Sequence, residues 1–190
     1  AETPEELEIA REKQRRLASH EVNSEMQSAA QLAEREVMLR PGLSGGLWVP
    51  GDGIVYAPNV ARWFIANAGD KLTHLVDPAI RLEEPTVTLQ SGRQLRADAI
   101  VVACGLGANT LLGEPWLRAK KGQLAITDRY GPLVNHQLVE LGYGASAHGG
   151  GTSVAFNVQP RPTGQLLIGS SRQFDNEDRE LDLPLLAAML

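Results

Sequence analysis

Residues 98–113, DAIVVACGLGANTLLG, include residue types that could contact a nucleotide. An apolar, β-branched run ends in Gly105-Leu106-Gly107, and a helix-forming sequence follows. A strand that ends in glycines at the start of a helix can place bare backbone against a nucleotide. Gly105 and Gly107 have the pair spacing of the Gly-x-Gly-x-x-Gly motif, but Thr110 stands where its third glycine would be. The sequence therefore predicts a strand-turn-helix unit with an incomplete dinucleotide motif.

Other reactive residue types are few and scattered. Cys104 is the single cysteine, and the four histidines lack metal-ligand spacing, so we expect no disulfide and no metal site. The net charge of −5, without a long basic block, argues against nucleic acid as a partner. No apolar run approaches the roughly 20 residues of a membrane span, and no signal peptide is recognisable. These features predict a cytoplasmic protein.

Helices and strands up to residue 115 should position the glycine turn. Thr3 and Pro4 predict the start of a helix that continues to about His20, and Ser28 predicts a second helix to about Leu39. A third helix, 57–68, should bury one side, formed by Val60, Trp63, Phe64 and Ile65. The expected strands are 46–49, 54–56, 72–76, 86–89, 94–96 and 99–103, the last covered on both faces.

Beyond Pro115 the pattern changes to short apolar runs separated by glycine- and proline-rich turns. This pattern is typical of an antiparallel sheet. A small-residue loop, 142–151, interrupts the run of strands. The four expected strands are 122–128, 136–141, 152–159 and 165–170.

This order of elements resembles the D-amino-acid oxidase family of FAD-dependent oxidoreductases. Three stretches carry the resemblance: VPGDGIVYAP before a helix, ADAIVVACGLGAN, and KKGQLAIT together with QPRPTGQLLIGSSRQF. The runs HQLVELGY and SVAFNVQ look closest to bacterial D-hydroxyproline dehydrogenase-like members. The chain starts without Met and stops in an apolar run, so we expect it to be the central part of such an enzyme.

The resemblance implies an α/β protein with two parts: an antiparallel substrate-binding sheet with helices, and a partial FAD-binding α/β domain. The expected divisions are 1–56, a helical segment with the first strands of the substrate domain, and 57–115, the partial FAD-binding domain. Residues 116–174 should form the substrate-domain sheet, and 175–190 should begin a further helix.

In this family FAD takes a hydride from a carbon next to an amine. The resemblance therefore implies that the enzyme oxidises a small D-amino acid or imino acid to the imine, with a D-hydroxyproline-like compound as one such substrate. The protein binds the neutral amine, aligns its C–H bond and excludes water, which requires no acid–base pair. The electron acceptor is open between dioxygen, a quinone and a partner subunit. The chain alone is expected to carry no FAD and to be inactive, and self-association is expected. The alternative is an interaction module without flavin; a nicotinamide dehydrogenase is disfavoured by the incomplete motif.

The resemblance assigns the flavin contact to the glycine turn, where small residues let the backbone approach the cofactor. The alternative is a tight turn that packs on its own domain. Cys104 is expected to be a small buried hydrophobe rather than a nucleophile. The expected cofactor-binding residues are Ala103, Cys104, Gly105, Gly107 and Ala108.

The resemblance also places substrate-binding residues on the sheet. Lys121 and Gln123 could bind substrate or a flavin oxygen, or lie at a solvated strand end. Arg172 is expected in a surface ion pair with Asp175 or Glu177 rather than on a carboxylate. Strands 122–128 and 152–159 should be neighbours, with Asn157 facing the substrate and Phe156 packed on helices. The expected substrate-binding residues are Lys121, Gln123, His136, Tyr143, His148 and Asn157. For His136 the alternative is a structural role. For Tyr143 and His148 the alternative is that their loop is disordered rather than folded over the site.

Overall fold

The computed structural model describes residues 1–142 and 151–190. The chain divides into two compact units, each of which is described by itself. Unit 1 joins Ala1–Ile54 to Lys120–Leu190, and unit 2 is Val55–Ala119. Tyr143 and His148 lie outside the described residues.

Unit 1 begins with helix α1 (Pro4–Ala18), and the Thr3 hydroxyl at its N-terminus accepts a hydrogen bond from the Glu6 amide at 3.2 Å. Ser28 and Gln31 form a reciprocal capping box at the start of α2 (Ala29–Arg35). This helix ends earlier than the expected Leu39, because Glu36 has extended backbone angles and its side chain is buried. Strands β1 (Glu25–Gln27) and β2 (Gly46–Trp48) form an antiparallel pair.

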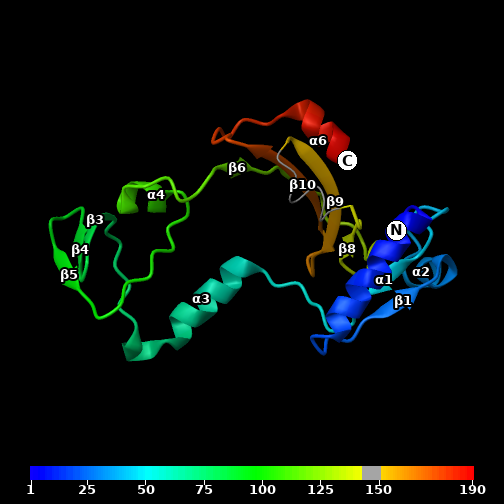
Figure 1. Cartoon of the computed structure of the whole chain (residues 1–190), viewed down its shortest axis with the longest axis horizontal. Coiled ribbons are helices and arrows are strands. Elements are labelled where there is room, and N and C mark those ends of the chain that lie inside the picture. The colour runs from blue at the N-terminus through cyan, green and yellow to red at the C-terminus, as the bar shows by residue number, and fades with distance from the viewer. Residues whose placement is uncertain (143–150) are drawn as a thin grey trace. The chain divides into compact units, whose positions relative to one another are not determined.

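The larger sheet of unit 1 is antiparallel, as the sequence predicted, with the order β6-β10-β9-β8, and with β7 also paired to β10. Figure 1 shows β9 and β10 as its long strands, with helix α6 (Leu183–Met189) packed against them. The strands are β6 (Lys120–Lys121), β7 (Leu124–Ile126), β8 (Leu138–Val139), β9 (Ser153–Pro160) and β10 (Leu166–Phe174).

The segments 122–128 and 152–159 belong to one sheet, as expected, but β10 lies between β7 and β9, so the two are not direct neighbours. The short turn that joins β9 to β10 makes these two strands neighbours, and β7 then adds to the free side of β10. Gly169 pairs with both Leu124 and Asn157; a Cβ there would come within 2.2 Å of Leu124 Cδ2. Phe156 is 41% exposed although Val158 on the same strand is buried, so the apolar residues of β9 do not pack as one set on helices.

Unit 2 contains α3 (Ala57–Asn67), a short 3-10 helix η1 (Gly69–Lys71), a three-stranded antiparallel sheet and α4 (Gly107–Leu112). The predicted hairpin is confirmed as β4 (Thr86–Leu89) and β5 (Gln94–Arg96). The third strand is β3 (Ala79–Glu83), which the sequence analysis missed. Helix α4 packs against β3.

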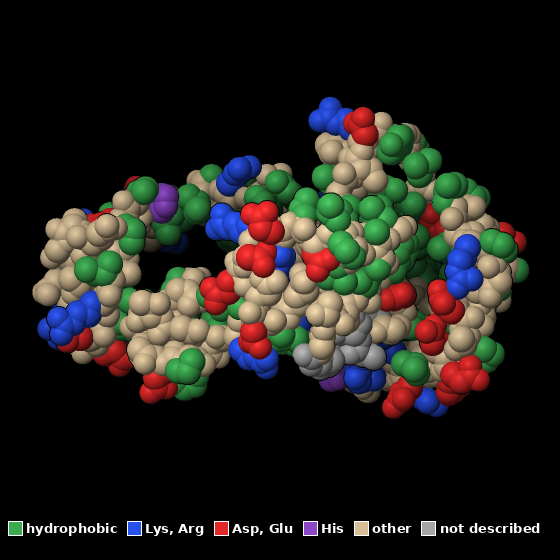
Figure 2. Space-filling model, turned by 90° about the horizontal axis from the view of Figure 1, so that it is seen from above, with side chains coloured by type: hydrophobic (Ala, Val, Ile, Leu, Met, Phe, Trp, Pro, Cys, Tyr) green, Lys and Arg blue, Asp and Glu red, His purple; other side chains and the backbone are tan. Residues whose placement is uncertain are grey.

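Three predicted strands, 54–56, 72–76 and 99–103, are not strands in the structure. A β-strand needs a hydrogen-bonded neighbour, and within the described residues none pairs with these segments. Val101 is 87% exposed, so the expected burial of 99–103 on both faces is also wrong. The predicted buried side of α3 is exposed too, including Trp63 and Phe64. Figure 2 shows many hydrophobic side chains at the surface of the molecule.

We expect the 190-residue chain to self-associate through unit 2, because Trp63, Phe64 and Val101 leave apolar surface in contact with water. The double substitution Trp63→Glu and Val101→Lys should shift the chain towards a monomer in sedimentation velocity. Leu181→Glu, which changes an exposed leucine of unit 1, is the control and should leave the sedimentation of the oligomers unchanged. A wild-type chain that sediments as a monomer at all concentrations would contradict this expectation.

Candidate functional site

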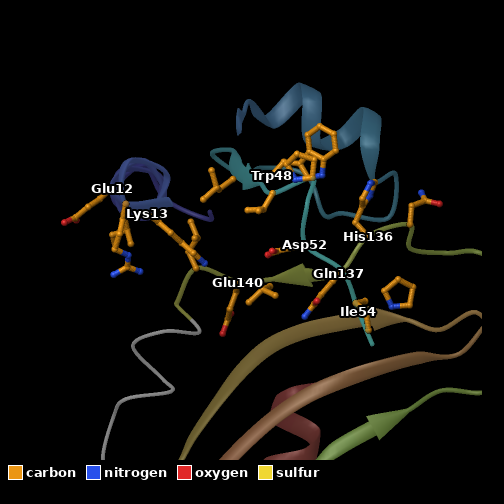
Figure 3. Close-up of a pocket in the computed structure, with 18 residues that line it drawn as sticks. Glu12, Lys13, Trp48, Asp52, Ile54, His136, Gln137 and Glu140 are labelled. Atoms are coloured by element: carbon orange, nitrogen blue, oxygen red, sulfur yellow. The ribbon is translucent and has the colours of Figure 1, made fainter. Parts of the chain in front are cut away.

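Unit 1 contains a cavity with a volume of about 1040 Å³. Its walls come from α1, from β2 with the loop that follows it, and from the segment 135–141, which includes β8 (Figure 3). The polar lining residues are Glu12, Lys13, Arg16, Asp52, Asn135, His136, Gln137 and Glu140. Leu47, Trp48, Val49, Pro50, Ile54 and Val139 are among the apolar ones. Polar and apolar side chains thus contribute about equally to the wall, and polar groups that converge in a concave site can orient a small organic molecule.

His136, one of the predicted substrate-binding residues, lies in this wall and is held by a buried carboxylate. Its Nδ1 is 2.5 Å from Oε1 of Glu36, whose side chain is only 4% exposed. The Asn135 amide donates to both oxygens of the same carboxylate, at 2.9 and 3.2 Å. The contact between Nδ1 of His136 and Oε1 of Glu36, together with the two bonds from Asn135, fixes the orientation of the His136 ring.

Trp48 supports this arrangement from β2. Its ring meets the His136 ring edge to face, with centroids 6.5 Å apart. The Arg35 guanidinium lies 3.7 Å from the Trp48 ring centroid, within the range of a cation–π contact. Arg35 also donates to Oε1 of the buried Gln27 at 3.1 Å. Residues from α2, β1 and β2 thus hold one side of the cavity.

Asn157 on β9 is linked to the same cavity wall through Gln137. Gln137 Nε2 donates to Oδ1 of Asn157 at 3.3 Å, and Asn157 pairs with Val139 of β8. Glu140 continues the ladder beyond β8, since its amide donates to Phe156 O and its carboxylate accepts from the Phe156 amide. The structure therefore brings His136 and Asn157 to the β8–β9 edge of the sheet.

Lys121 and Gln123 lie elsewhere on the sheet, beside β10. The Gln123 side chain is buried, donates to Asp182 O at 3.3 Å and accepts from the Asp182 amide at 2.8 Å. Asp182 in turn caps α6 through the Leu185 amide. Lys121 forms an ion pair with Asp178. Both side chains therefore hold the segment that leads into α6.

The hydrogen bond from Lys121 lowers the pKa of Asp178 below the ordinary value of an aspartate. A lowered carboxyl pKa stabilises the fold above the unfolded pKa of about 4, and this stabilisation disappears as the pH falls through the folded value. We expect Lys121→Met to raise the pKa of Asp178 towards the ordinary value, measured by NMR titration of its carboxyl carbon. Lys71→Met in unit 2 is the control. An unchanged Asp178 titration in Lys121→Met would contradict the assignment.

The glycine turn of unit 2 leaves bare backbone open. Gly105 has φ of +59°, and a Cβ added there would have no heavy atom within 4 Å. The amides of Gly107 and Ala108 donate to Cys104 O and Gly105 O, within the turn itself. These features fit a surface that a flat cofactor ring could approach closely. Ala108 is buried, whereas Cys104 is exposed, which corrects its expected burial and follows from the lack of a strand over 99–103.

One further finding corrects a sequence prediction, and two concern features that were searched for in the described residues. Arg172 is 9% exposed, so its side chain is not at the surface, where the sequence analysis expected it. No group of three or more metal-binding side chains occurs in the part of the chain that the structure describes. Nor does a described helix have the length and apolarity to cross a membrane.

Sequence reasoning missed several of the residues that form the cavity. Glu36, Trp48, Asp52 and Gln137 were not singled out, and neither was Lys13 of α1. Glu36 lay inside the helix that the sequence predicted to about Leu39, so its local pattern did not indicate a buried site residue. Its burial depends on residues about one hundred positions away in the chain.

Comparisons with known proteins agree with this fold. The structure is similar to a glycine oxidase from Bacillus cereus ATCC 14579, with a TM-score of 0.77 and 16% sequence identity over 100% of this chain and 51% of that one. It is also similar to glycine oxidase from Geobacillus kaustophilus, with a TM-score of 0.75 and 20% identity over 98% of this chain and 50% of the other. The chain thus spans about half the length of these structures. No curated protein matches the sequence.

The comparison with protein families gives a match along the entire sequence. The family described as "DAO: FAD dependent oxidoreductase" matches residues 1–190. The chain belongs to this family of FAD-dependent oxidoreductases.

Proposed function

We propose that this chain supplies the substrate-binding part of an enzyme that oxidises a small amino or imino acid to the imine with FAD. The observation that carries the proposal is the family match over residues 1–190. When bound, FAD supplies the acceptor for the hydride that leaves the substrate. The residues of this chain then bind the amine, orient its C–H bond and exclude water.

Each unit has a proposed part in this function. The turn at 103–108 in unit 2 is proposed to contact the flavin, and the support is the open backbone at Gly105. In unit 1, His136 and Asn157 at the β8–β9 edge are the proposed substrate-binding groups. Lys121 and Gln123 are proposed to act indirectly, by holding the segment before α6.

The substrate is proposed to be a D-amino acid or a D-hydroxyproline-like imino acid, and glycine is included because two similar structures are of glycine oxidases. The test is anaerobic reduction of the flavin in the complete gene product, followed at about 450 nm. Glycine, sarcosine, D-alanine, D-proline and D-hydroxyproline form the substrate panel. We expect at least one of them to bleach the flavin, and a gene product without flavin would favour the interaction module instead.

We expect Asn157→Leu to lower the kcat/KM of the complete enzyme by about tenfold to a hundredfold. The substitution removes a hydrogen-bonding group from the proposed substrate side, and an unpaired buried partner costs about 1–3 kcal/mol. Gln90→Leu, at an exposed position of unit 2, is the control and should leave kcat/KM unchanged. Unchanged kcat/KM in Asn157→Leu at unchanged stability would place Asn157 outside the site and favour Phe156.

A further inference from the structure

Glu36 and His136 form a carboxylate–imidazole pair at the wall of the unit 1 cavity. The Glu36 side chain is 4% exposed, whereas the His136 side chain is 40% exposed and lines the cavity. Nδ1 of the ring lies 2.5 Å from Oε1 of Glu36, and Nε2 has no hydrogen-bond partner among the described residues. One ring nitrogen therefore meets a buried carboxylate, and the other remains to meet a ligand.

The surroundings of the Glu36 carboxylate suit its ionised form. The Asn135 amide donates to both oxygens, at 2.9 and 3.2 Å, and an ionised carboxylate accepts these bonds as well as the contact from His136. With Glu36 ionised, Nδ1 is the donor of the pair. Nε2 of the neutral ring then has a lone pair that can accept a proton.

We propose that His136 accepts the proton that an amine substrate must lose before oxidation, and that Glu36 is the positioning residue that acts through it. The inference rests on the proposed function for the choice of an amine as substrate. An alkyl amine is mostly an ammonium ion at neutral pH, since it loses its proton only near about pH 10. An ammonium nitrogen lacks the lone pair that forms the imine, so this proton must leave before the hydride does. The family resemblance implied no acid–base pair, and this inference adds one.

The proposed transfer moves one proton, and no electrons, from the substrate to the protein. The N–H bond of the ammonium breaks, its electron pair stays on the substrate nitrogen, and the proton forms a bond to Nε2 of His136. The ring becomes an imidazolium ion, and the opposite charge of Glu36 beside it favours this charged form. The proton then passes to water at the exposed side of the ring.

Other charged side chains line the same cavity from three elements. They are Glu12, Lys13 and Arg16 of α1, Asp52 in the loop after β2, and Glu140 after β8. From α2, Arg35 lies against Trp48, whose ring meets the His136 ring edge to face. Within the described part of the chain, Glu36 is the carboxylate that pairs with His136. A carboxylate is also a much weaker base than an imidazole, so Asp52 and Glu140 are the poorer proton acceptors.

The arrangement of protons is tested by NMR on the 190-residue chain without flavin. The ring ¹⁵N signals of His136, identified by their loss in His136→Gln, report which nitrogen carries the proton. For the neutral ring we expect a proton on Nδ1 and none on Nε2, and Glu36→Gln should move both signals away from this pattern. Glu34→Gln, which removes a charge from an exposed position of the same helix, should leave them unchanged. A neutral ring with its proton on Nε2 in the wild-type chain would overturn the proposal.

The pH dependence of the complete enzyme tests the transfer itself, with the amine that reduces the flavin fastest. His136→Gln should lower kcat/KM about a hundredfold near about pH 7, the lower end of what a general base contributes. The loss should shrink below about tenfold near about pH 10, because the solution then supplies the neutral amine. An equal loss at both pH values would indicate a structural role alone and would overturn the proposal.

Glu36→Gln tests the positioning role, because the amide keeps an acceptor for the Asn135 amide. We expect the folded variant to lose about tenfold in kcat/KM near about pH 7 and to recover at high pH in the same way as His136→Gln. Glu34→Gln and His20→Gln change exposed side chains of unit 1 and should stay within about twofold of the wild type. A loss confined to low pH in Asp52→Asn but absent from His136→Gln would make Asp52 the acceptor and contradict the assignment.

The two measurements distinguish failure of this inference from failure of the proposed function. If an amine reduces the flavin and His136→Gln keeps the wild-type kcat/KM at both pH values, the inference fails and the function stands. If no amine reduces the flavin, but the neutral His136 ring carries its proton on Nδ1 only while Glu36 is present, the function fails and the orientation of the pair stands.

Discussion

Replacing Glu36 with leucine is expected to lower the free energy of unfolding of unit 1 by about 3 kcal/mol, because breaking a buried charged hydrogen-bond set by removing one partner costs about 3–5 kcal/mol. The lower end applies here, since the His136 side chain is 40% exposed and can turn to water. The Asn135 amide, which donates to both carboxylate oxygens, loses its acceptor entirely. Urea unfolding followed at the amide signals of β9 and β10 measures the loss within unit 1.

Glu36→Gln is the matched comparison and should cost about 1 kcal/mol, because one oxygen acceptor remains while the charge is lost. Glu34→Leu, on the exposed side of α2, tests whether any loss of a carboxylate near this helix end has the same effect. It should change the stability by less than about 0.5 kcal/mol. Equal losses in Glu36→Leu and Glu34→Leu would show that the buried contacts contribute nothing.

Gly164→Ala is expected to destabilise unit 1 by about 3 kcal/mol or more, through two separate effects. Gly164 lies in the β9–β10 turn with φ of +83°, a left-handed conformation that costs a residue with a Cβ about 1–2 kcal/mol. The added Cβ would also come within 2.4 Å of Tyr130 O. Because this oxygen belongs to the backbone, it can move away only if the chain around Tyr130 shifts. That displacement would strain the 2.9 Å hydrogen bond from the Tyr130 amide to Gly164 O.

Gly42→Ala isolates the first of these effects. Gly42 lies in the same unit with φ of +84°, but a Cβ there would have no heavy atom within 4 Å. Gly42→Ala is therefore expected to lower the free energy of unfolding only through the left-handed backbone conformation, by about 1–2 kcal/mol. Urea unfolding of both variants gives the cost of the collision as their difference, and equal losses would mean that the Tyr130 segment moves aside without strain.

The sequence predicted several local elements because their causes are local. Thr3 with Glu6 and Ser28 with Gln31 mark helix starts through hydrogen bonds made within one turn. The hairpin of β4 and β5 follows from alternating residues on either side of Ser91-Gly92. The antiparallel sheet beyond Pro115 follows likewise from apolar runs between turn residues. The family resemblance follows from the motifs at 49–58, 97–109, 120–127 and 159–174.

The errors fall where an element depends on a partner that is distant in the chain. Residues 99–103 have the composition of a buried strand, but a strand forms only beside another strand, and within the described residues none pairs with them. Strand β3 was also missed, and in the structure it pairs with β4. The order of β7, β10 and β9 was likewise wrong, since register and neighbours are decided by the whole sheet.

The sequence by itself determined the helix starts, the hairpin, the antiparallel class of the larger sheet and the family. Tertiary structure decided which polar residues meet. It separated Gln123, held by Asp182, from His136 and Asn157 at the β8–β9 edge. It also buried Glu36 against a histidine that follows it by one hundred residues. The physical reason is that helix caps and turns depend on contacts within a few residues, whereas a cavity is formed by side chains whose neighbours are set by the packing of the whole unit.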